Sequence, residues 1–188
     1  PIKSSAASDV YKRQVVAVEV DDWFRQFSPW PSKQLDGKFV GEAEKTWQWM
    51  EEHVLPECGA DAAGKMPDRK IYIMGYSLAG LFALWALMEK PVLSGAISCS
   101  GSLWYPDFMG KIQNDCHKLH GKKIYLSVGG KEANTKDPLM ANVITCTKET
   151  YGLLKDQNDV KYELNSGGHF ADAGKRLAKG LRWMLEEE

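Results

Sequence analysis

The sequence predicts an α/β fold in which a mostly parallel sheet lies between two layers of helices. Short runs rich in Val, Ile, Leu and Tyr alternate with longer runs in which apolar residues recur at helical spacing. Regular alternation of strands and helices is typical of a parallel, doubly wound sheet, because each crossover places a helix on one face. The 188 residues are enough for one such domain with a sizeable core. We therefore expect a single three-layer domain over residues 15–188.

The same pattern predicts where the individual elements lie. Residues 21–38 and 61–69 contain prolines and glycines and are expected to be loops; the aromatic residues of the first loop either line a pocket or pack the loop onto the core. Strands are expected at residues 15–20, 70–74, 95–98, 122–128 and 160–164. Helices are expected at residues 42–57, 78–90, 106–119, 138–156 and 171–187.

The first fourteen residues differ from the rest of the chain. They have no initiating methionine and no hydrophobic period, and they resemble translated adaptor sequence. We interpret residues 1–14 as a non-native leader and leave them out of the fold prediction. The native chain is then expected to begin near Val15, already inside a strand, with any earlier strands or targeting signal outside this sequence.

Composition excludes several classes of protein. Hydrophobic residues make up 44% of the chain, charged residues 26%, and the formal net charge is −1, so neither a nucleic acid nor a membrane surface is an expected partner. No apolar run is long enough for a transmembrane helix. The four cysteines, at positions 58, 99, 116 and 146, have no disulfide-framework spacing, which favours free thiols and a cytoplasmic location.

A serine motif is the most informative local feature. The β-rich run that ends at Gly75 is followed by Ser77, and a helix with many apolar residues begins directly after this serine. A strand, a sharp turn built from small residues, a serine and a helix form a nucleophile elbow. The usual motif is Gly-x-Ser-x-Gly; here Ala79 occupies the fifth position and Gly80 follows, a mild departure. Ser77 is the candidate nucleophile.

One of the four histidines has the sequence context of a general base. His169 follows two glycines at the end of an expected strand, which makes an open loop suited to presenting an imidazole. His53 is expected on a helix. His117 and His120 lie near Cys116, but no second Cys/His pair lies at metal-ligand spacing, so no metal site is expected.

The candidate acids lie between or beside these two residues. Glu132 follows the expected strand at 122–128 and is the first choice, because side chains just past strand ends form the sites of α/β sheets. Asp137 precedes a proline and is better interpreted as a helix N-cap, and Asp172 is a weaker third candidate. The order Ser77, Glu132, His169 is the nucleophile–acid–base order of α/β-hydrolases.

Several motifs together resemble one family. The chain is similar to the putative esterase (esterase D-like) family of α/β-hydrolases, and particularly to its enterochelin-esterase-like branch. The resemblance covers nearly everything from Val15 onward. The residues that carry it are Arg25 with Ser28-Pro29-Trp30, Gly41-Glu42-Ala43-Glu44, Gly75 to Gly80, Ser100-Gly101-Ser102-Leu103-Trp104, Val128 to Glu132, and Gly167-Gly168-His169-Phe170 with Arg176.

The resemblance implies a serine esterase that needs no cofactor and acts on a small-molecule ester. Ser77 would be the nucleophile, Glu132 the acid and His169 the base, and the Leu78 amide would donate to the oxyanion. In this family, earlier strands and a loop that supplies a second oxyanion donor precede the segment that matches residues 15–20. We therefore expect the chain as given to be weakly active or inactive, and poorly stable.

The resemblance leaves substrate contacts and two other functions open. Trp30, Trp104 and Tyr105 are candidates for the substrate pocket, and Arg25 is either a contact for an anionic substrate group or a salt-bridged surface residue. One alternative function is an inactive hydrolase-fold or binding domain. The other is an acyltransferase. Hydrolysis is favoured over acyl transfer because the sequence has no long apolar insertion that could form a cleft for an acceptor.

Overall fold

The computed structural model describes residues 14–59 and 69–186. Within these ranges the chain alternates helices with strands, as the sequence predicts. The elements, with η for 3-10 helices, are α1 (Trp23–Phe27), α2 (Ala43–His53), β1 (Ile71–Tyr76), α3 (Leu78–Glu89), β2 (Leu93–Cys99), α4 (Phe108–Asp115), η1 (Cys116–Leu119), β3 (Lys123–Gly129), η2 (Met140–Asn142), α5 (Val143–Leu154), β4 (Asp159–Asn165) and α6 (Ala173–Leu185).

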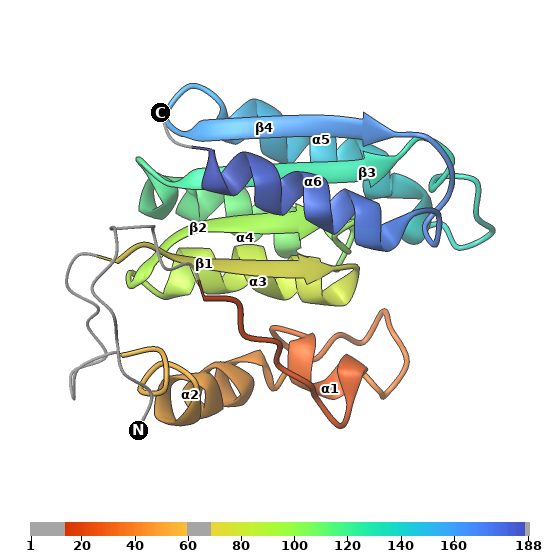
Figure 1. Cartoon of the computed structure of the whole chain (residues 1–188). Coiled ribbons are helices and arrows are strands. Elements are labelled where there is room, and N and C mark those ends of the chain that lie inside the picture. The colour runs from red at the N-terminus through yellow and green to blue at the C-terminus, as the bar shows by residue number, and fades with distance from the viewer. Residues whose placement is uncertain (1–13, 60–68, 187–188) are drawn as a thin grey trace.

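The four described strands form one parallel sheet in the order β1-β2-β3-β4. Helix α6 crosses one face of this sheet, while α3, α4 and α5 lie on the other (Figure 1). The three-layer α/β architecture predicted from the sequence is therefore confirmed. All four strands end at the same edge, so the loops that follow them gather there.

Helix α3 lies inside the protein. Ten of its twelve residues are buried, because the sheet covers one side of the helix and α1 packs against another. The ring of Phe27 in α1 lies 5.1 Å from that of Phe82 in α3. A helix that is apolar on all sides requires such double coverage. The helix that begins at the candidate nucleophile is therefore held from two directions.

Helix α6 has one apolar face, and this face closes the second layer. Leu177, Leu181 and Met184 pack with Ile97 and Tyr125 of the sheet. The approach is close at Gly180, where a Cβ atom would lie 2.6 Å from a methyl carbon of Ile97. Glycine at this position therefore lets α6 pack closely against the sheet, which brings the first turn of the helix near the carboxyl ends of the strands.

Some expected boundaries are wrong. The strand expected at residues 15–20 is absent: these residues pair with no strand among the described residues and are mostly exposed, with Val15 69% exposed. Strand-like residue types alone, without a neighbouring strand to pair with, did not produce a strand here. The expected loop at 21–38 contains helix α1, which Asp22 caps by accepting from the amide of Arg25. Most of the expected loop at 61–69, and residues 1–13 of the leader, lie outside the described residues. No helix within the described ranges is long and apolar enough to cross a membrane.

Candidate active site

Ser77 occupies a strained turn between β1 and α3. Its φ and ψ angles are 57° and −122°, a conformation rare for a residue with a side chain. The turn is tight because a Cβ atom at Gly75 would collide with the backbone of Ala79. The Ser77 amide bonds to the carbonyl of Cys99, and the Ser77 carbonyl accepts from the amides of Gly80 and Leu81. Strand and helix thus hold the serine from both sides.

Three of the sequence-predicted residues meet at the carboxyl edge of the sheet. The Oγ atom of Ser77 lies 3.0 Å from Nε2 of His169, and Nδ1 of the same ring lies 2.8 Å from Oε2 of Glu132. Because an ionised carboxylate can only accept, Nδ1 carries the proton and Nε2 is left to accept from the serine hydroxyl. The His169 side chain remains one-third exposed, whereas that of Glu132 is 1% exposed.

Glu132 is held by several donors at once. Its second oxygen, Oε1, accepts from the Ser100 hydroxyl at 2.7 Å, the Gly129 amide at 2.6 Å and Nη1 of Arg176 at 2.7 Å. Burial raises the pKa of Glu132, but hydrogen bonds from His169, Ser100 and the Gly129 amide outweigh it and hold the pKa below its usual range. The buried carboxylate is therefore ionised at neutral pH.

The other candidate acids have other partners. Oδ1 of Asp137 accepts from the amides of Leu139 and Met140 in the turn before η2. The contact resembles a cap, but η2 begins at Met140 and α5 at Val143, so Asp137 is not the N-cap of the expected helix. Asp172 stands at the N-terminus of α6 in a left-handed conformation and pairs with the exposed Lys175. The geometry therefore brings Glu132, and not these two aspartates, to the imidazole of His169.

The remaining histidines lie on other elements. Nδ1 of His53 faces the carbonyl of Trp49 at the end of α2, and Nδ1 of His117 faces that of Asn114. His120 follows η1 and is exposed. Within residues 14–59 and 69–186, no three or more Cys, His, Asp or Glu side chains lie together in a group that could hold a metal ion.

The four predicted substrate contacts separate into two groups. Arg25 donates to both carboxylate oxygens of Glu42, at 2.7 and 3.1 Å, so its charge is already paired. Tyr105 is 1% exposed, and its hydroxyl donates to the carbonyl of Trp30 at 2.6 Å. It therefore fixes the backbone at Trp30 and presents no surface to a ligand. Trp30 and Trp104 are only partly buried and keep exposed surface.

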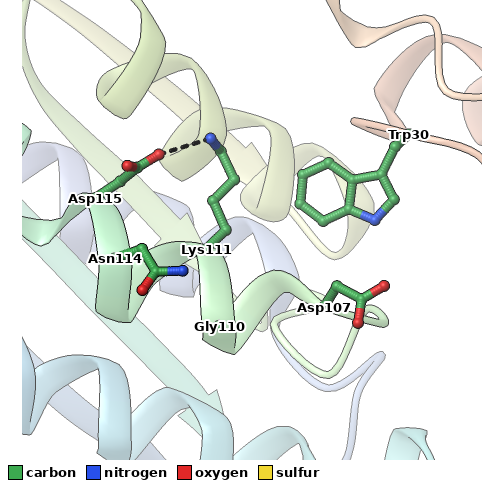
Figure 2. Close-up of a pocket in the computed structure, with 6 residues that line it drawn as sticks. All are labelled: Trp30, Asp107, Gly110, Lys111, Asn114 and Asp115. Atoms are coloured by element: carbon green, nitrogen blue, oxygen red, sulfur yellow. Dashed lines mark hydrogen bonds and ion pairs between the residues drawn. The ribbon is translucent and has the colours of Figure 1, made fainter.

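Trp30 lines an open pocket of about 610 Å³ that contains none of Ser77, Glu132 and His169. Figure 2 shows its indole across the opening from helix α4. The indole stacks against Phe108 and donates to the carbonyl of Pro106 at 3.1 Å. The side chains that line the pocket are those of Trp30, Asp107, Lys111, Asn114 and Asp115, with Gly110.

Three polar residues around the site were not predicted to have a role. Tyr76 and Ser100 lie inside two segments that carry the family resemblance, Gly75 to Gly80 and Ser100-Gly101-Ser102-Leu103-Trp104, but neither was given a role. Arg176 was noted only as part of the family resemblance. A sequence signal does exist for Arg176: it is an arginine near the start of a strongly amphipathic helix, and in the structure it is 1% exposed.

Comparison with known proteins gives one family match. The family model described as putative esterase matches residues 4–176. The uncharacterized protein YbbA of Bacillus subtilis (strain 168) is 21% identical over 180 residues, which cover 90% of this chain and 72% of YbbA.

Comparison with solved structures identifies similar folds. The BES protein of Bacillus cereus superposes with a TM-score of 0.70 at 22% identity, over 88% of this chain and 64% of that one. The siderophore hydrolase EstB of Aspergillus nidulans superposes with a TM-score of 0.68 at 19% identity, over 87% and 65%. The chain therefore spans just under two thirds of the length of these structures, and at such identities the likeness establishes the fold alone.

Proposed function

Because the chain belongs to the putative esterase family and has an α/β-hydrolase fold, we propose that it is a serine esterase with Ser77, His169 and Glu132 as its catalytic triad. The observation that carries the proposal is the continuous chain of hydrogen bonds from Ser77 Oγ through the His169 ring to Glu132. The substrate class is a small carboxylic ester.

The reaction has two steps. Ser77 Oγ attacks the ester carbonyl while Nε2 of His169, 3.0 Å away, takes the hydroxyl proton. The tetrahedral oxyanion is stabilised by the amide of Leu78, the first residue of α3, where backbone amides point out of the helix end. The protonated imidazole then gives its proton to the departing alcohol, which leaves an acyl-serine.

Water completes the cycle by the same route. His169 takes a proton from water as the water attacks the acyl-serine, and it returns this proton to Ser77 Oγ as the acid product leaves. Glu132 keeps the imidazole oriented through Nδ1 and stabilises its charged form. Trp104 keeps exposed surface and lies two residues after Ser102, whose amide bonds to the Ser77 carbonyl, so it is the proposed substrate contact. Trp30 also keeps exposed surface but lines a pocket that does not include the triad residues.

A fluorophosphonate probe tests the nucleophile. Because the chain as given is expected to be weakly active, we expect slow labelling at Ser77, mapped by tryptic peptides, and no labelling of Ser77→Ala. Ser94→Ala, at the opposite edge of the sheet in β2, is the matched control and should label like the unmodified chain. A folded chain that is not labelled at Ser77 would leave the binding-domain interpretation in front.

Product analysis distinguishes hydrolysis from acyl transfer. With p-nitrophenyl butyrate as substrate, we expect free butyrate as the product in the presence of an added alcohol or sugar. Predominant formation of the new ester would instead assign an acyltransferase to the same triad.

A further inference from the structure

The guanidinium of Arg176 lies beneath the candidate triad. Arg176 belongs to the first turn of α6, and its side chain is 2% exposed. It bonds to groups from the ends of three strands and from the loop that carries His169. No other described arginine or lysine side chain is as deeply buried.

One nitrogen of this guanidinium binds the acid. Nη1 donates to Oε1 of Glu132 at 2.7 Å and to the hydroxyl of Ser100 at 2.8 Å, and Ser100 in turn donates to the same Oε1. Because Oε1 is used in this way, Oε2 is the oxygen that faces His169. Ser100 has a positive φ of 48°, so the backbone at the end of β2 accepts strain to place this hydroxyl.

The other nitrogen binds the histidine loop. Nη2 donates to the carbonyl of Ser166 at 3.0 Å and to that of Gly168 at 2.9 Å. Both of its protons are used on backbone oxygens within three residues of His169. The Tyr76 hydroxyl, which accepts from Nη1 at 3.2 Å, donates to the carbonyl of His169 itself. Hydrogen bonds to backbone carbonyls therefore fix the loop both just before His169 and at His169 itself.

We propose that Arg176 is a positioning residue that sets the separation of Glu132 and His169 by binding both the acid and the histidine loop. The proposal rests on the proposed esterase function. Two properties of arginine are needed: the positive charge balances the buried carboxylate, and the planar fork presents its donors in two fixed directions. Lysine retains the charge but has no fork.

The test compares Arg176→Met with Arg176→Lys in the full chain, by fluorophosphonate labelling rate across pH 5–9. Arg182→Met is the matched control, because Arg182 is an exposed arginine of the same helix. Thermal unfolding by circular dichroism establishes whether each variant is folded. Unmodified chain and Ser77→Ala, labelled alongside, test the esterase function separately: a folded chain that is not labelled refutes the function, and the variants then have no reference rate.

We expect two distinct effects. Arg176→Met should label about 10- to 100-fold more slowly, part of what a well-placed general base contributes. Its acid midpoint, the pH at which the rate falls to half, should rise by about one unit or more, because without the nearby positive charge the Glu132–His169 pair binds its extra proton more tightly. Arg176→Lys should lose rate with little change in the acid midpoint.

The proposal is overturned if a folded Arg176→Met loses rate equally at every pH with an unmoved acid midpoint, since this would indicate a purely structural role. If Arg176→Met does not fold, Arg176→Lys decides. A rate within about two-fold of the unmodified chain would then show that the fork does not position the loop, whereas a rate about 10-fold lower with an unmoved midpoint would support the proposal.

Discussion

Replacing Gly129 by alanine is expected to damage both stability and labelling, whereas the same change at Gly130 is expected to do neither. Gly129 is the last residue of β3, and a Cβ atom there would lie 2.5 Å from the Gly167 carbonyl oxygen, 2.7 Å from Nη2 of Arg176 and 2.8 Å from Oε1 of Glu132. At Gly130 the nearest atom would be a backbone oxygen at 3.6 Å, an ordinary contact.

The magnitude follows from these distances. Overpacking a rigid site costs about 1–3 kcal/mol, and here the crowded atoms include a backbone oxygen and two ends of a buried ion pair that cannot rotate away. Neither glycine has a positive φ, so alanine introduces no backbone strain at either position. At Gly130 the smaller entropy of the unfolded chain should stabilise the protein by about 0.4–1 kcal/mol.

Urea unfolding followed by circular dichroism measures the first effect, and the fluorophosphonate labelling rate measures the second. We expect a lower urea midpoint and slower labelling for Gly129→Ala, and a midpoint at or above that of the unmodified chain for Gly130→Ala. Equal midpoints and equal labelling rates for the two variants would refute the argument that the network around Glu132 has no room for a methyl group.

Three further outcomes are expected. The unmodified chain should have a larger unfolding free energy than Glu132→Gln at pH 7, and this difference should shrink as the pH falls below about 4.5, because hydrogen bonds hold the pKa of Glu132 under that ordinary value. Urea midpoints of both chains from pH 7 to 3.5 check this, and a constant difference between them would contradict it. Tyr105→Phe should lower the unfolding free energy by about 1–2 kcal/mol, because the Trp30 carbonyl loses its donor; an unchanged urea midpoint would argue otherwise. Phe170→Ser should change that free energy by less than about 0.5 kcal/mol, because the ring is 92% exposed, and a larger loss would show that the ring packs in solution.

Much of the fold could be predicted because its signals are local. Apolar runs of strand length and helical periodicity predicted the order of elements from β1 to α6, and the fold class is confirmed. The juxtaposition of Ser77, Glu132 and His169 also followed from sequence, because parallel strands bring their carboxyl ends to one edge. The catalytic role of these residues stays a prediction.

The network around the acid could not be predicted, because its members are far apart in sequence and ordinary in type. Tyr76 and Arg176 are separated by 100 positions, and no spacing rule connects a tyrosine in a strand to an arginine in a helix. Short elements were missed for a similar reason. Helix α1 spans only five residues, fewer than a periodic pattern needs, so its aromatic residues were interpreted as a loop.

The position of Arg176 in the chain has a consequence for the order in which the site assembles. The hydrogen bond between Ser77 and His169 closes a loop of 92 residues, and the bond between Tyr76 and Arg176 closes one of 100. Contacts of such separation are formed late in folding, since the entropy of closing the loop is lost before the contact stabilises anything. A brief detachment of α6 would likewise release the histidine loop while β1, β2 and α3 stay packed together. Catalytic activity would then be lost before the protein unfolds, so an activity measurement would show whether α6 is packed against the sheet.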